Sequence, residues 1–186
     1  NQCIEAVNAL VADANMLGKA AVEGKLATRA DASRHQGDFR RIVQGVNDTL
    51  DAVITPLNVA ATYVDRISKG DVPPKITDTY QGDFNTLKNN LNVCVDAVNA
   101  LVADATLLSR AAIAGKLATR ADTSKHQGDF RKIVEGVNET LDNVVGPIND
   151  VRRVMSAMEQ GDMTQTINAN YQGDFDALKQ AINNTI

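Results

Sequence analysis

The chain has 186 residues, a net charge of −4 and a pI near 5.1, so it lacks the basic surface that nucleic-acid binding requires. Hydrophobic residues make up 44% of the chain but aromatic residues only 4%, which favours an aliphatic core of closely packed helices. No uninterrupted apolar stretch approaches the ~20 residues that span a bilayer, and no signal peptide is recognisable. We therefore expect a soluble segment. Because it opens without Met and stops inside a repeat, we expect it to come from a longer protein.

A four-fold repeat organises the chain. A Gln-Gly-Asp-Phe motif recurs at intervals of 45, 46 and 45 residues, and a second glycine precedes each copy. Units of this size are too small to bury separate cores, so they must share one. We place the units at residues 1–53, 54–98, 99–144 and 145–186, the last one truncated at its C-terminal end. The motif predicts the start of a helix at Asp38-Phe39, Asp83-Phe84, Asp129-Phe130 and Asp174-Phe175.

The units are of two alternating types. The segment that begins Val7-Asn8-Ala9 returns 91 residues later at Val98-Asn99-Ala100, so units 1 and 3 form one type and units 2 and 4 another. Type A units continue after the first glycine with Lys-Leu, and type B units continue with Asp followed by Val or Met. This alternation suggests that the two types have different mechanical roles.

Between the connectors, apolar residues follow a seven-residue pattern. The row from Phe39 to Ile67 steps by four and three residues in alternation, and so do the row from Phe130 to Met158 and the row from Phe84 to Ala112. An unbroken heptad pattern of this length predicts coiled-coil packing. We call these rows the seam. Pro56 and Pro147 fall within the predicted helices, where we expect a kink or a restart.

The stretches between helices are predicted to be long connectors with apolar anchors. Gly24, Gly70, Gly115 and Gly161 should end helices in the left-handed conformation, and the Asp of each Gly-Asp-Phe motif should cap the next helix or lie in its first turn. Each connector is long enough to return along the bundle, so the two helices of a unit can run parallel. The anchors are paired four residues apart: Leu26 and Ala30, Val72 and Ile76, Leu117 and Ala121, Met163 and Ile167.

Parallel helices, a Gly-x-hydrophobic-x3-hydrophobic connector, a proline in the first helix and a recurrent Asn after the acidic residue resemble the HAMP domain of bacterial sensory receptors. The proline matches at Pro56 and Pro147, and the Asn matches at Asn47, Asn92, Asn138 and Asn183. The resemblance implies an all-α fold of parallel four-helix bundles, each made by a homodimer and stacked end to end. It also implies a poly-HAMP array that passes conformational signals from sensor to output modules in the cytoplasmic part of a chemotaxis receptor. The parent could be tethered to the inner membrane by segments outside this chain.

Other functions fit the sequence less well. His35 and His126 have no companion cluster of metal ligands, so we expect solvated or capping histidines. Cys3 and Cys94 read as small buried hydrophobes, with a cross-dimer disulfide as the alternative. We expect no enzyme activity and no catalytic, cofactor or metal site. The expected partners are a second copy of the chain and adjacent modules, with no nucleic acid or small-molecule substrate. A hybrid histidine kinase and a purely structural coiled-coil spacer remain as alternative settings.

Overall fold

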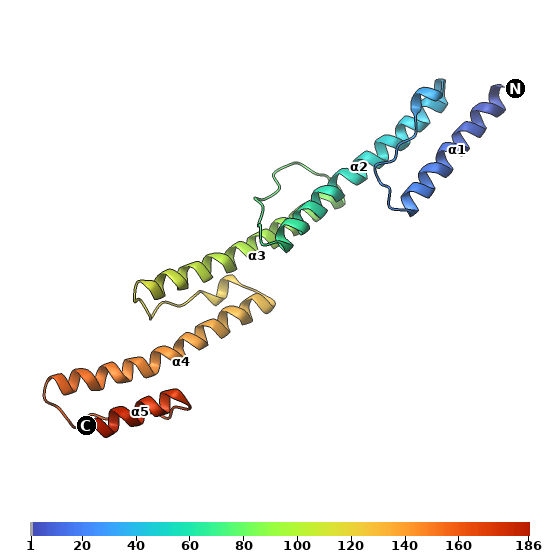
Figure 1. The fold of residues 1–186 in the computed structure, drawn as a ribbon. Coiled ribbons are helices and arrows are strands. Elements are labelled where there is room, and N and C mark those ends of the chain that lie inside the picture. Colours follow the sequence, from blue (N-terminus) through green and yellow to red (C-terminus); the bar gives the residue numbers. More distant parts are fainter. Residues whose placement is uncertain (1) are drawn as a thin grey trace. The chain divides into compact units, whose positions relative to one another are not determined.

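The fold is entirely helical in the part that the structure, a computed structural model, describes, which is residues 2–186 (Figure 1). This agrees with the all-α prediction. Two short 3-10 helices, η1 and η2, lie in the first and third connectors. In chain order the elements are α1 (Gln2–Val22), η1 (Ala32–Arg34), α2 (Gly37–Ser68), α3 (Gly82–Ile113), η2 (Thr123–Lys125), α4 (Gly128–Glu159) and α5 (Asp174–Thr185).

Helices α2, α3 and α4 each continue without interruption from one connector to the next. Each of them is therefore both the second helix of one unit and the first helix of the following unit. Pro56 and Pro147 lie inside α2 and α4, so of the two expected outcomes, a kink or a restart, the restart is excluded. A proline removes only one backbone hydrogen bond, and the remaining bonds of a 32-residue helix hold the turns on either side of it.

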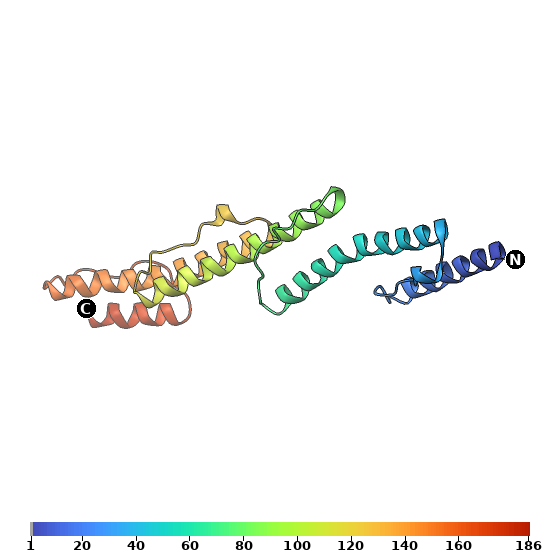
Figure 2. The same cartoon turned by 90° about the horizontal axis from the view of Figure 1, so that it is seen from above.

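The chain divides into two compact parts, Asn1–Val95 and Asp96–Ile186, each with the length of one type A plus type B pair. Within the first part, α1 and the beginning of α2 run in the same direction, with the connector returning between them (Figures 1 and 2). Helices α4 and α5 are parallel in the same way within the second part. The two helices of a unit therefore run parallel, as the connector lengths predict.

Each first glycine closes its helix with the same hydrogen-bond pattern. At the end of α1, the Gly24 N–H donates to Ala21 O at 3.1 Å, and the Lys25 N–H donates to Ala20 O at 2.8 Å. This pair of bonds is the Schellman motif, which requires a residue with positive φ between the helix and the connector. The φ angles are 72° at Gly24, 77° at Gly70, 70° at Gly115 and 83° at Gly161.

The second helix of each unit begins at the Gly-Asp-Phe motif. Its glycine also has positive φ, for example 53° at Gly37. Gln36 and Gln127 occupy the N-cap positions without a capping side-chain bond, while Asp38 and Asp129 lie in the first turn. Their carboxylates therefore act on the helix dipole and do not cap the helix.

The buried apolar residues of the long helices lie mostly beside the seam, and only some of them lie on it. Val43, Ile54, Val134, Val145 and Val154 are buried, whereas seam residues such as Val46, Val53 and Leu57 are each 43% exposed. The helices thus have two apolar faces. One face is covered by the chain's own connector and neighbouring helix, and the seam is left partly exposed except at positions such as Val43 and Val134.

Helix α3 is long and apolar enough to cross a membrane by length and composition alone. The apolar residues of α3 are nevertheless interrupted by Asp96, Asn99 and Asp104, so the expectation that no uninterrupted apolar stretch reaches the length of a span still holds. The test is weak evidence for a span, because the core helix of a bundle passes it too. In α3 the apolar residues include the seam, and Asp104 lies buried in the same helix.

The left-handed glycines give a direct stability prediction. Gly115→Ala should lower the free energy of unfolding by about 1 kcal/mol, because a residue with a Cβ is strained at positive φ. An added Cβ at Gly115 has no heavy atom within 4 Å, so the loss comes from the backbone alone. The measurement is urea or thermal unfolding.

Gly18→Ala is the matched control. Gly18 lies inside α1 without positive φ, its Cβ would also meet nothing within 4 Å, and the repeat has Ser109 at the same place. This substitution should raise stability by about 0.5–1 kcal/mol. Equal changes at Gly115 and Gly18 would contradict the assignment of Gly115 to a strained cap.

Candidate functional site: the contacts between helix and connector

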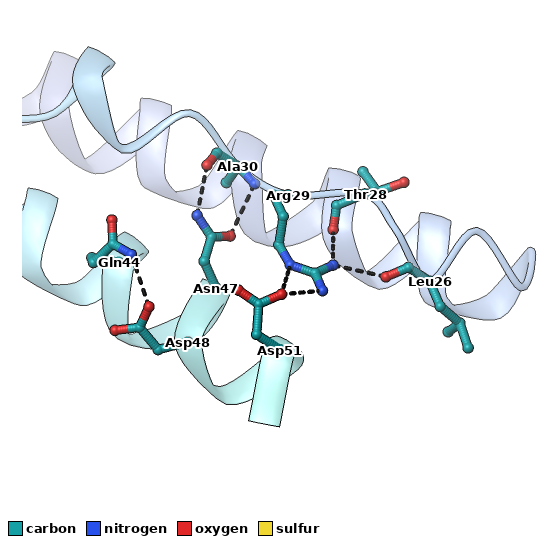
Figure 3. Close-up of polar contacts among 8 residues, drawn as sticks. All are labelled: Leu26, Thr28, Arg29, Ala30, Gln44, Asn47, Asp48 and Asp51. Carbon is teal, nitrogen blue, oxygen red and sulfur yellow. Dashed lines mark hydrogen bonds and ion pairs between the residues drawn. The ribbon is translucent and has the colours of Figure 1, made fainter. Parts of the chain in front are cut away.

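The recurrent Asn of the second helix holds the connector by its backbone. In unit 1, the Asn47 side chain accepts a hydrogen bond from the Ala30 N–H at 3.1 Å and donates one to Ala30 O at 2.8 Å (Figure 3). A buried backbone N–H and C=O need such partners, and the extended connector cannot supply them from its own chain. The same two bonds join Asn92 to Ile76, Asn138 to Ala121 and Asn183 to Ile167.

An arginine braces the connector in type A units. Arg29 donates through Nε and Nη2 to Asp51 Oδ1 on α2, at 2.9 and 2.6 Å, and through Nη1 to the backbone oxygens of Leu26 and Thr28 (Figure 3). Arg120 makes the equivalent contacts with Asp142, Leu117 and Thr119 in unit 3. The rigid fork of the guanidinium lets one side chain tie both the connector and the helix.

The short 3-10 helices of the type A connectors are capped by aspartates. Asp31 Oδ1 accepts from the Ser33 hydroxyl at 2.6 Å and from the Ser33 N–H at 2.9 Å. These hydrogen bonds, the hydroxyl first, lower the pKa of Asp31 from its ordinary value of 3.8. Asp122 and Ser124 repeat the arrangement in unit 3.

The two histidines are buried and paired with aspartates of the first helix. The distance from His35 Nε2 to Asp13 Oδ2 is 2.6 Å, and the same distance separates His126 Nε2 from Asp104 Oδ2. Of the two expectations, solvated or capping histidines, the first is therefore wrong, and both histidines occupy C-cap positions, those of η1 and η2. Each ring lies at the end of its connector and contacts an aspartate that precedes it by 22 positions in the sequence.

A tyrosine takes the place of the histidine in unit 4. The Tyr171 hydroxyl donates to Asp150 Oδ2 at 2.6 Å. This hydrogen bond, together with burial, raises the pKa of the Tyr171 phenol above its ordinary value of 10.0. The phenol therefore remains a donor throughout the neutral range.

Comparison with known proteins identifies the family to which the chain belongs. The sequence matches the HAMP domain family over residues 34–100 and 125–186, which together make up more than half of the chain. The chain belongs to the HAMP domain family. Over 78 residues, 42% of the chain, it is 37% identical to the methyl-accepting chemotaxis protein McpB of Pseudomonas aeruginosa. The matched stretch covers 12% of the length of McpB. The sequence-based identification as tandem HAMP domains is thus confirmed.

The predicted anchors of the HAMP connectors separate into two groups. The second residue of each pair, Ala30, Ile76, Ala121 or Ile167, is buried, and its backbone is the one held by Asn. The first residue is exposed in three connectors, at Leu26, Leu117 and Met163, and half-buried at Val72. In unit 4, Ile167 packs with Val154 and Ile182, which joins the connector to both helices.

Both cysteines are exposed in the single chain, so the expectation that they are buried hydrophobes is wrong at this level of assembly. Cys94 lies on the seam of α3, and Cys3 lies in the first turn of α1. Among residues 2–186, no group of three or more His, Cys, Asp or Glu side chains is arranged to hold a metal ion.

Sequence reasoning missed Asp13 and Asp104 as the partners of the histidines. The available signal was the repeat itself, because each aspartate lies 22 residues before its histidine in both type A units. It also missed the Arg29–Asp51 and Arg120–Asp142 braces, which have the same spacing.

The Asn contacts predict a specific loss of stability. Asn47→Ala should lower the free energy of unfolding by about 1–3 kcal/mol, because it leaves the buried Ala30 N–H and C=O without partners. Gln44→Ala is the control, since Gln44 lies one turn away on α2 and donates only an exposed bond to Asp48. That control should change stability by less than about 0.5 kcal/mol. Urea unfolding that finds the two variants equally stable would contradict the role of Asn47.

The raised pKa of Tyr171 predicts an effect at alkaline pH. Because the folded pKa exceeds the unfolded value, this contact stabilises the fold below about pH 10 and is lost as pH rises through the folded pKa. Asp150→Asn should lower the pH at which Tyr171 ionises in the folded protein, measured by NMR of ring-labelled tyrosine. Asp142→Asn, which removes a carboxylate bonded to Arg120, should leave it unchanged. A Tyr171 titration that is the same in Asp150→Asn as in the wild type would refute the assigned cause.

Proposed function

We propose that this chain is the signal-relaying part of a bacterial chemoreceptor, which works as a parallel homodimer in the cytoplasm. Membership of the HAMP family and the likeness to a methyl-accepting chemotaxis protein support this proposal. The chain has no enzymatic role in it. It joins a sensor module to an output module of the same protein, and its partner is its own second copy.

The observation that carries the proposal is the half-exposed seam. Val46, Val53 and Val64 of α2 are 43–59% exposed in the single chain, and Val137 and Val144 of α4 are 42% and 40% exposed. A continuous apolar row in a heptad pattern requires partner helices, because burial supplies most of the stability of long helices. A second copy with the same row supplies those helices and completes a four-helix bundle in each unit.

The relay follows from the continuity of the helices. Since α2, α3 and α4 each belong to two consecutive units, a rotation or tilt of one bundle is delivered directly to the next. Such a relay needs elements with two packings of similar energy. Small seam residues, Ala60, Ala105 and Ala112, allow the helices to repack. A purely structural spacer would not require four connectors that are each held by an Asn side chain.

Cross-linking at Cys94 tests whether two copies pack along the seam, although an antiparallel pair with its dyad near Cys94 would also bring the two thiols together. In a parallel homodimer, Cys94 lies opposite its twin on the seam and should form a disulfide readily under mild oxidation. Cys3→Ser should be introduced so that Cys94 is the sole thiol. A folded dimer that does not cross-link at Cys94, or a stable monomer in sedimentation, would contradict the parallel arrangement.

Substitution in the full receptor tests the relay. Ala105→Leu enlarges a side chain on the seam of α3 and should favour one of the two helix packings over the other. The signalling output should then differ from that of the wild type even without a stimulus. Ala103→Leu adds the same bulk on the opposite face of α3 and should leave the output unchanged. Kinase or swimming-behaviour assays provide the measurement, and unchanged signalling with Ala105→Leu would count against repacking as the mechanism.

A further inference from the structure

Two positions, one on the first helix and one at the end of the connector, lie close together in all four units and carry different chemistry. The helix position lies 11 residues before the first glycine, and the connector position lies two residues before the glycine of Gly-Asp-Phe. We call these two positions the seating pair. It is filled by Asp13 and His35, Val59 and Tyr80, Asp104 and His126, and Asp150 and Tyr171 in units 1 to 4.

In type A units the seating pair is polar and buried. His35 and Asp13 are 5% and 9% exposed, and His126 and Asp104 are 4% and 8% exposed. Their hydrogen bond of 2.6 Å joins α1 or α3 to the last residues of the connector. Among residues 2–186, no buried side-chain nitrogen or oxygen lacks a hydrogen-bond partner.

In unit 2 the same place is filled by apolar surface. Val59 of α2 and the Tyr80 ring line one small cavity together with Pro56, Ile76 and Phe84. The helix position offers no carboxylate here. The hydroxyl of Tyr63 makes another contact, with Pro74 O at 2.9 Å, but this bond is exposed and lies nearer the beginning of the connector.

In unit 4 an aspartate faces a tyrosine. Asp150 accepts from the Tyr171 hydroxyl at 2.6 Å. An aspartate at the helix position therefore accepts either an imidazole or a phenol as its donor. A valine is found only opposite a tyrosine, whose ring can be buried against it.

We propose that the seating pair is a matched lock that holds the end of each connector against the first helix of its unit. Three pairings fit: Asp with His, Asp with Tyr, and Val with Tyr. The pairing of Val with His does not fit, because it leaves a buried imidazole facing an apolar side chain. Removing one partner of a buried polar pair is costly, whereas replacing both by a well-packed apolar pair can be nearly neutral.

The test exchanges pairings in unit 1 of the intact protein and follows amide hydrogen exchange of connector residues 25–36 by mass spectrometry. Asp13→Val creates the mismatched pair and should speed exchange of this connector by about fivefold to a hundredfold. His35→Tyr reproduces the pairing of unit 4, and the double variant Asp13→Val/His35→Tyr reproduces that of unit 2. In both variants the exchange rate of the connector should remain within about threefold of the wild-type rate.

Unit 3 supplies the internal control, since its connector, residues 116–127, keeps the Asp104–His126 contact in every variant. If Asp13→Val destabilises the whole chain, the double variant still tests the proposal, because adding His35→Tyr should return the exchange rate of residues 25–36 to near the wild-type value. If residues 25–36 exchange in Asp13→Val at the wild-type rate, the seating pair does not hold the connector. If they exchange in the double variant as fast as in Asp13→Val, the proposed rule for which pairings fit is wrong. Because the readout is connector opening and not signalling, either failure would leave the proposed relay untouched.

Discussion

The parallel direction of the two helices in each unit is the constraint on which the rest of the structure depends. A chain that leaves one helix at its C-terminal end must return along the bundle before the next parallel helix can begin. The returning segment is extended, so its backbone polar groups need partners outside the segment. The Asn side chains of the second helices supply those partners, with two hydrogen bonds to one connector residue in every unit. Left-handed glycines then allow the sharp departure from each first helix.

This arrangement divides the apolar surface of each long helix between two tasks. On the seam itself, Val43 and Val134 are covered by the chain, whereas Val46 and Val137 are 43% and 42% exposed. The connector is thus held within the single chain, while the exposed part of the seam is the surface that the proposed second copy would cover. In the proposed relay, packing along the seam would change while the Asn contacts keep each connector in place. We regard this separation as the physical basis for a relay that changes shape without unfolding.

Much of the fold could be predicted from the sequence, because local sequence patterns determine where the helices lie. Heptad spacing indicated the continuous helices, and the repeated glycines indicated their ends. The contacts of His35 and His126 could not be read in this way, since their partners lie 22 residues away on another helix and an isolated Asp in a helix usually faces water. A helix restart at Pro56 was one of two expected outcomes, and it does not occur because the flanking turns compensate for one lost hydrogen bond. Exposure of Cys94 could not be anticipated, because the seam that contains it is incomplete in one chain.

The alternation of unit types has a concrete chemical form in the structure. Type A connectors carry an arginine brace, a capped 3-10 turn and an Asp–His contact, and all three repeat in units 1 and 3. The account nevertheless depends most on the parallel pairing of two copies. Pulsed electron resonance on spin labels placed singly at Thr49 and Thr140, both exposed, tests it directly. We expect each label to give one distance within the width of a four-helix bundle. Distances that exceed the width of the bundle for both labels would mean an antiparallel dimer and would contradict the parallel pairing of two copies.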